Sequence, residues 1–124
     1  MKRPTVIYEQ FDVVVVPFPF TDKSASKRRP ALVLNNDILS KSGKYVLAMI
    51  TSSKQFPWPL DIHIKDLDST GLAHPSIVRM KIFTLDAELI LRRAGRLSEI
   101  DRARTKQAIN ALFQSGCPTQ STNV

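Results

Sequence analysis

The sequence predicts a small, mainly-β fold with one C-terminal helix, and three observations support this class. Short apolar runs, several of them rich in β-branched residues, recur along most of the chain. Polar stretches that contain proline or glycine separate these runs. After residue 98 the apolar spacing becomes helical. Short strands joined by such turns indicate a small closed barrel or sandwich with the helix packed on it.

Apolar runs place the strands. Residues 13–16 are four valines, which favour a strand buried on both faces, and Pro17 and Pro19 are expected to stop its pairing. Residues 30–34, 45–50 and 76–85 form further runs, whereas residues 18–28 and the proline-containing aromatic stretch 56–59 are interpreted as loops. Residues 88–91 fit a short strand or a helical turn. Alternation over 60–65 predicts that Leu60, Ile62 and Ile64 face the core while Asp61, His63 and Lys65 face solvent.

The C-terminal helix is expected to begin at a capping box formed by Ser98 and Asp101 and to end before Gly116 and Pro118. Its apolar face is predicted from five residues: Ile100, Ala103, Ala108, Ala111 and Leu112. The length suits one domain over residues 1–124, with a core at about 8–113 and a polar tail at 114–124.

The charge balance favours a polyanionic partner. Eighteen Lys and Arg against eleven Asp and Glu give a formal net charge of +7, which suits RNA, DNA, an acidic protein segment or an anionic membrane. The single cysteine, Cys117, excludes an internal disulfide and a multi-cysteine metal site. With no secretory signal and no bilayer-length apolar run, we expect a cytoplasmic protein without membrane contact. No ligand-like spacing points to a metal or a cofactor.

Two segments carry a resemblance to a known family. The first is FDVVVVPFPFTD at residues 11–22, followed by KRRPALVL at 27–34, and the second is AMITSS at 48–53. Together with shorter matches at 71–72, 75–79 and 82–86, they make the chain similar to the MazF/PemK toxins of bacterial type II toxin–antitoxin systems over about residues 8–113.

The resemblance implies a fold and an activity. The fold is a small SH3-like barrel shared by MazF, PemK and CcdB toxins, usually as a homodimer. The activity is sequence-selective endoribonuclease cleavage of single-stranded mRNA, without a metal ion, which inhibits translation and growth. A cognate antitoxin would neutralise the toxin through an acidic segment laid across the RNA groove. DNA would be contacted only through the antitoxin complex.

The resemblance also assigns candidate catalytic residues. Arg29 matches the family's catalytic arginine, and its planar guanidinium suits two phosphate oxygens at once. Thr51 matches the second catalytic position, where a hydroxyl bonds the phosphate. Arg79 corresponds to an arginine that some members use near the scissile phosphate, and Ser52 is a further candidate for phosphate or catalytic support. By residue type alone, Arg29 would be an ordinary surface arginine and Thr51 an ordinary strand end.

Three departures from the family pattern affect this assignment. Ser24 lies near the place where some members carry a glutamate, and Lys81 replaces the acidic residue that follows Arg79 in others, so no Arg/Asp arrangement is expected. Phe11 stands in place of a conventional glycine and should affect the turn into the first strand. The general base stays open among three residues of suitable type: Asp22, His63 and His74.

RNA contacts are expected from charge and aromatic side chains around Arg29. The basic residues before it, which should attract phosphates without reading sequence, are Lys23, Lys27 and Arg28. The aromatic residues that would stack on unpaired bases are Phe18, Phe20, Phe56 and Trp58. The simpler interpretation places at least two of these four in the core or a dimer interface. Of the four, Trp58 is the one predicted to be exposed, because prolines flank it.

Two alternatives to a ribonuclease remain. One is a CcdB-like toxin that binds DNA gyrase without nuclease activity, but the polar end of the predicted helix fits that class poorly. The other is a catalytically inactive module that binds RNA or an antitoxin, which the altered loop before Arg29 keeps open.

Overall fold

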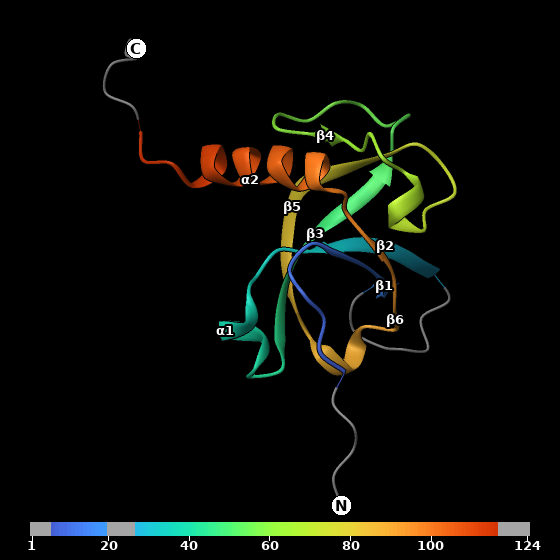
Figure 1. The fold of residues 1–124 in the computed structure, drawn as a ribbon, viewed down its shortest axis with the longest axis vertical. Helices are drawn as coiled ribbons and strands as arrows, with labels where there is room; N and C mark the ends of the chain where they lie inside the picture. Colours follow the sequence, from blue (N-terminus) through green and yellow to red (C-terminus); the bar gives the residue numbers. More distant parts are fainter. Residues whose placement is uncertain (1–5, 20–26, 117–124) are drawn as a thin grey trace, which may run out of the picture.

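The computed structural model describes residues 6–19 and 27–116. Its elements in chain order are β1 (Asp12–Phe18), β2 (Lys27–Val33), α1 (Asp37–Ser40), β3 (Lys44–Ser52), β4 (Ile62–His63), η1 (Asp68–Thr70), β5 (Ser76–Asp86), η2 (Ala87–Leu89), β6 (Arg92–Arg96) and α2 (Glu99–Phe113). These strands form a curled antiparallel sheet in the order β4-β5-β3-β2-β1-β6, with α2 across one end (Figure 1). The predicted mainly-β fold with a C-terminal helix is confirmed.

The sheet buries apolar side chains on both of its faces. Val13 belongs to the cluster that includes Ala108 of α2, whereas Val14 and Val16 belong to the cluster around Tyr45. Because successive side chains of a strand point to opposite faces, β1 must be covered on both sides. The predicted two-sided burial of residues 13–16 is therefore confirmed for three of the four valines, which are fully buried.

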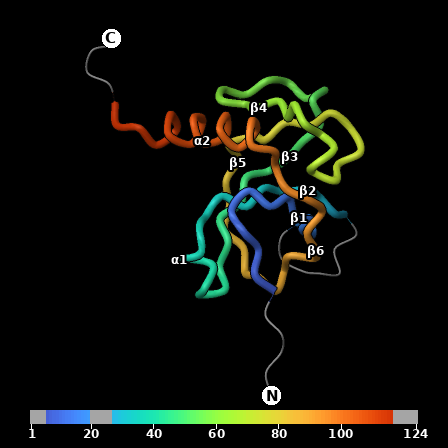
Figure 2. Tube along the Cα trace, viewed as in Figure 1, coloured from blue at the N-terminus to red at the C-terminus, as the bar shows by residue number. Residues whose placement is uncertain are grey.

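Phe11 adopts a backbone conformation that glycine usually adopts. Its φ is 72°, in the left-handed region, yet its ring is buried in the core. Its N–H donates to the Val33 carbonyl at 2.7 Å, and its own carbonyl accepts from the N–H of Leu97 at 3.0 Å. Figure 2 shows the blue segment before β1 passing the orange segment that leads into α2. Packing and these two hydrogen bonds hold the residue in its turn.

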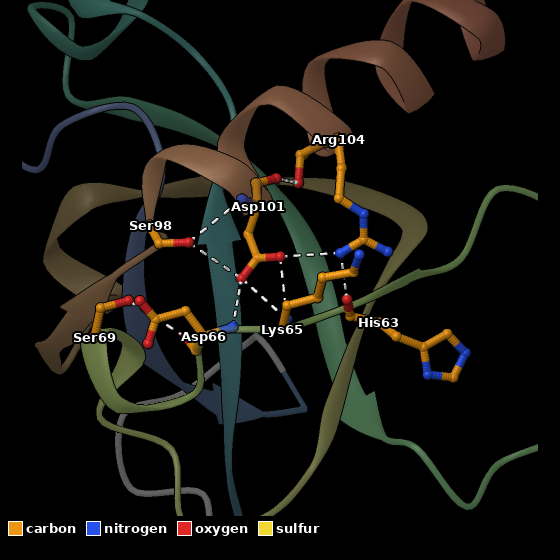
Figure 3. A network of polar contacts seen from close by, with 8 residues as sticks. His63, Lys65, Asp66, Ser69, Ser98, Asp101 and Arg104 are labelled. Carbon is orange, nitrogen blue, oxygen red and sulfur yellow. Dashed lines mark hydrogen bonds and ion pairs between the residues drawn. The ribbon is translucent and has the colours of Figure 1, made fainter.

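The C-terminal helix begins as predicted, and Ala108 of the predicted apolar face is buried, but the other four residues of that face are exposed. Ser98 accepts a hydrogen bond from the Asp101 N–H, which confirms the cap. Ile100, however, is 63% exposed, whereas Asp101 and Thr105 are fully buried. The Asp101 carboxylate accepts from the backbone N–H groups of Lys65 and Asp66 and from Arg104 (Figure 3). A carboxylate with this many donors is stable inside the fold, so the helix buries Asp101 and leaves Ile100 exposed.

Several strand predictions need correction. Pro17 remains in the β1–β2 ladder, opposite Arg28, because it lies beyond the residues of β1 that pair with β6, at an edge where proline is tolerated. Strand β6 (Arg92–Arg96) was not predicted, since its charged sequence lacks apolar alternation. Leu60, which was predicted to face the core, is exposed with a φ of 67°.

In the described part of the chain, no helix is long and apolar enough to cross a bilayer.

Replacing Asp101 with Ala should lower the free energy of unfolding by about 2–4 kcal/mol, because buried donors lose their acceptor. Burial alone would raise the pKa of Asp101, but the N–H groups of Asp66 and Lys65, with Arg104, outweigh it and hold that pKa below its usual value. The stabilisation is therefore present above pH ~3.9 and disappears as the pH falls through the lower folded-state pKa. Urea unfolding at several pH values measures both effects.

The matched control is Asp68→Ala, at an exposed aspartate of η1. It should change stability by less than about 0.5 kcal/mol. Equal losses in the two variants would contradict the anchoring role of Asp101.

Candidate active site

Sheet register places Arg29 and Thr51 at the same end of neighbouring strands. In the antiparallel β2–β3 pair Ala31 lies opposite Met49. Arg29 and Thr51 are each two residues further toward the same end, so their side chains share one face of the sheet. Both residues are half-buried. The two positions that the sequence proposed as catalytic are therefore brought together.

Two adjoining hollows meet at this point. The first has a volume of about 320 Å³ and the second about 280 Å³. Four residues line both: Arg29, Ile50, Thr51 and Gln55. The first hollow is completed by Phe18, Met49, Trp58, Arg79 and Lys81. The second is completed by Pro30, Ser52, Leu72, Ala73, His74, Pro75 and Ser76. Arg29 and Thr51 therefore lie where the two hollows adjoin.

Arg79 is held in a buried ion pair. It is 8% exposed, so Arg79 is not a solvated strand residue. Its Nε donates to Oδ1 of Asp61 at 3.1 Å, and its Nη2 donates to Oδ2 at 2.9 Å and to the Phe56 carbonyl at 2.6 Å. The hydrogen bond from Arg79 is the largest of the effects that keep the pKa of Asp61 below its usual value. Asp61 is therefore an anionic anchor for Arg79.

This pair corrects two expectations from the sequence. Asp61 was predicted to face solvent, but its carboxylate points to Arg79 because burial of the guanidinium requires a counter-charge. An Arg/Asp arrangement was not expected, because Lys81 replaces the acidic residue that the resemblance implied for some members. The structure supplies an acid from the segment before β4 instead.

Two arginine–aromatic stacks border the first hollow. The Cζ atom of Arg29 lies 4.8 Å from the centroid of the Phe18 ring. The Cζ atom of Arg79 lies 4.9 Å from the centroid of Trp58. Trp58 is 43% exposed, and its backbone N–H donates to Asp61 at 2.8 Å. The prediction that Trp58 is exposed is therefore confirmed, whereas Phe56 is more exposed still but lines neither hollow.

A local irregularity turns Arg79 and Lys81 toward the first hollow. In the β3–β5 pair Ala48 lies opposite Ile82, whereas Ile50 lies opposite Val78. The single residue Met49 of β3 therefore lies opposite three residues of β5, 79–81. Such bulges re-aim side chains, and both cations line the hollow.

The other proposed site residues fall into three groups. Ser52 and His74 line the second hollow. Lys27 and Arg28 are exposed on β2 next to Arg29 but line neither hollow. His63 is also outside both, and its ring points away from the Asp101 network in Figure 3. Phe20, Asp22 and Lys23 lie outside the described residues. Among residues 6–19 and 27–116, no group of His, Cys, Asp and Glu side chains is arranged to hold a metal ion.

Sequence reasoning missed Gln55 and Asp61 as site residues. Gln55 lies in a polar stretch whose sequence contains no motif or periodicity that would mark it as a site residue. Asp61 lay in an alternating run that marked it as exposed, and only its proximity to Arg79, eighteen residues away in the chain, reveals its place.

Comparison with known proteins identifies the family. The family model described as "PemK-like, MazF-like toxin of type II toxin-antitoxin system" matches residues 9–113. The chain belongs to this toxin family. Among MazF relatives, the "Probable endoribonuclease MazF" of Mycolicibacterium smegmatis is 30% identical over 84 residues, which cover 67% of this chain and 77% of the relative.

Solved MazF structures share the fold. The MazE–MazF crystal structure (Form-II) from Deinococcus radiodurans has a TM-score of 0.68 at 16% identity and covers 90% of this chain and all of that one. The Mycobacterium tuberculosis toxin MazF-mt6 has a TM-score of 0.65 at 18% identity, covering 86% and 99%. A mycobacterial endoribonuclease in complex with its cognate antitoxin has a TM-score of 0.67 at 13% identity, covering 89% and 99%. These likenesses confirm the predicted barrel of the MazF/PemK fold.

Removing the anchor of Arg79 should destabilise this MazF-family chain. We expect Asp61→Ala to lower the free energy of unfolding by about 3–5 kcal/mol, because it leaves a buried guanidinium without its counter-charge. Trp58 emission should change as well, since Arg79 is no longer fixed against the ring. Urea unfolding followed by circular dichroism, with fluorescence of the folded protein, measures both.

Asp86→Ala is the matched control. Asp86 pairs with Lys44 at the surface, where both side chains are about half exposed, so its loss should cost less than about 1 kcal/mol. A similar cost for the two variants would show that the Asp61–Arg79 pair does not hold the site together.

Proposed function

We propose that this chain is the toxin of a type II toxin–antitoxin pair and acts as a metal-independent endoribonuclease on single-stranded mRNA. The observation that carries the proposal is the placement of Arg29 and Thr51 where two hollows adjoin. Family membership and the name of the M. smegmatis relative support the same activity. Cleavage of messages at short preferred sequences would stop translation and growth.

The proposed reaction uses the RNA's own 2′-hydroxyl as nucleophile. A base removes its proton, the 2′-oxygen forms a bond to phosphorus, and the bond from phosphorus to the 5′-oxygen breaks. An acid protonates the departing 5′-oxygen. The products are a 2′,3′-cyclic phosphate and a 5′-hydroxyl end, with no net change in atoms. Since the nucleophile belongs to the substrate, the protein's task is to position the phosphate and to stabilise its added charge.

Each residue at the junction takes one role in this proposal. Arg29 donates to the phosphate oxygens as the pentavalent phosphorane gains negative charge, because a guanidinium spans two oxygens. The Thr51 hydroxyl bonds the phosphate and fixes its orientation, and Ser52 supports it. Arg79 adds positive charge from the wall of the first hollow. His74, the one described histidine that lines a hollow, takes the role of general base.

The partners follow from the same surface. Lys27 and Arg28, with Lys23 shortly before them in the sequence, attract the RNA backbone, and Phe18 and Trp58 stack on bases; Phe20 is a further stacking candidate. A cognate antitoxin would present an acidic segment to this basic site, as the MazE–MazF complexes of related fold suggest. We further propose a cytoplasmic homodimer that contacts DNA only through the antitoxin complex.

Arg29→Ala should reduce cleavage of a long single-stranded RNA in EDTA by about 10²–10³-fold, because one lost donor to a developing oxyanion has effects of this size. Primer extension would locate the cleaved bonds, and time courses would give the rates. Arg92→Ala, an exposed arginine on β6 that lines neither hollow, serves as the control and should cleave normally.

Two outcomes would oppose this assignment. Equal cleavage by the wild type and Arg29→Ala would mean that Arg29 is not catalytic or that a contaminating nuclease cuts the RNA. An absence of cleavage in every variant would favour the gyrase-binding or inactive alternatives, and inhibition of DNA gyrase would then separate those two.

His74→Gln should lower kcat by about 10²-fold while KM changes little, since a general base acts in the transition state and contributes little to binding. His63→Gln is the control at a histidine outside both hollows. A kcat unchanged by His74→Gln would remove His74 from the mechanism and leave Asp22 as the remaining candidate.

A further inference from the structure

The first hollow presents an unusual set of polar groups, with cationic donors on several sides. Arg29, Arg79 and Lys81 all line it. Asp61, the partner of Arg79, does not line it and already accepts hydrogen bonds from Arg79 and from the Trp58 N–H. A ligand in this hollow therefore meets N–H donors and few acceptors.

Two of these cations have N–H donors that no described residue accepts. Lys81 is exposed, and its ammonium group makes no hydrogen bond or ion pair with any residue in the described part of the chain. Arg79 uses Nε and Nη2 for Asp61 and Phe56, whereas its Nη1 makes no hydrogen bond within residues 6–19 and 27–116. Because three residues of β5 face Met49 alone, Lys81 and Arg79 reach the same hollow from one strand.

The remaining walls suit a flat, unsaturated ring. Trp58 is partly exposed and is fixed from one side by Arg79, and Phe18 is fixed by Arg29. Aromatic rings and guanidinium planes both stack on nucleobases. The volume of about 320 Å³ accommodates one base with its hydration.

We propose that the first hollow is a subsite for one nucleobase next to the scissile phosphate and that it selects keto bases over amino bases. Guanine presents O6 and N7 as adjacent acceptors, and uracil presents O4, whereas adenine and cytosine place an amino donor at the equivalent position. A keto oxygen accepts from Lys81 and from Nη1 of Arg79, but an amino group would face these donors without a partner. This inference rests on the proposed function and adds base selectivity to it.

Gln55 does not decide the choice between keto and amino bases. Its carboxamide lines both hollows and carries both a donor and an acceptor, so it can turn to suit either edge. The selectivity therefore depends on the cations of β5, and Lys81 is the residue to change because it is exposed and has no structural partner among the described residues.

The test compares hexamers of 2′-O-methyl nucleotides, which lack the free 2′-hydroxyl and cannot be cleaved by the proposed reaction. Uridine against cytidine, and inosine against adenosine, differ in a keto or amino group on the base and in the hydrogen on the adjacent ring nitrogen. Trp58 is the only tryptophan of the chain, so its fluorescence reports occupancy of the hollow. We expect each keto hexamer to bind about tenfold more tightly than its amino counterpart, as for one charge-assisted hydrogen bond.

Lys81→Met should reduce this preference to about twofold or less while the protein stays folded. Lys54→Met is the matched control, because Lys54 is an exposed lysine of the nearby loop and lines neither hollow; it should keep the wild-type preference. Equal binding of keto and amino hexamers by the wild type, or an undiminished preference in Lys81→Met, would overturn the proposal.

The binding experiment separates this inference from the catalytic proposal. A protein that prefers keto hexamers but cleaves no RNA would keep the subsite and lose the ribonuclease. A protein that cleaves RNA but binds all four hexamers equally would keep the ribonuclease and lose the subsite.

Discussion

The register between β2 and β3 is the constraint on which the rest of the site depends. Ala31, Leu32 and Val33 are buried on alternate faces of the sheet, opposite buried residues of β3. A slip by one residue would exchange the faces of the strand and expose or crowd these side chains. The core therefore fixes the alignment, and this alignment brings Arg29 beside Thr51. Packing in the core thus sets the geometry of polar groups at the surface.

The second half of the site is organised by electrostatics rather than by apolar packing. A bulge in β5 aims Arg79 and Lys81 at one hollow, and Asp61 neutralises and fixes the buried Arg79. Fixing the guanidinium also fixes Trp58, which stacks on it. Since donors held in advance need no reorganisation when a ligand arrives, the hollow is already arranged for an acceptor-rich, planar group.

Sequence patterns predicted the parts of this molecule that depend on local order. Residues 13–16 and the Ser98 cap were identifiable because burial and capping act over a few neighbours, and Arg29 with Thr51 came from the resemblance to a toxin family. The Asp61–Arg79 pair could not be predicted, because it joins separate segments and contradicts the alternation around Asp61. Ile100 was predicted to be buried for a similar reason, because the partners that stabilise the buried Asp101 in its place lie far away in the chain.

The most direct test of the account removes one 2′-hydroxyl group from the substrate. A single 2′-deoxy nucleotide would be placed on the 5′ side of a mapped cleavage site in an otherwise unchanged RNA, and the wild-type protein would be assayed in EDTA. The account predicts that the all-ribose RNA is cut to a 2′,3′-cyclic phosphate and that the substituted bond stays intact. Cleavage of the substituted bond, or loss of all activity in EDTA, would contradict a metal-independent reaction driven by the substrate's own hydroxyl.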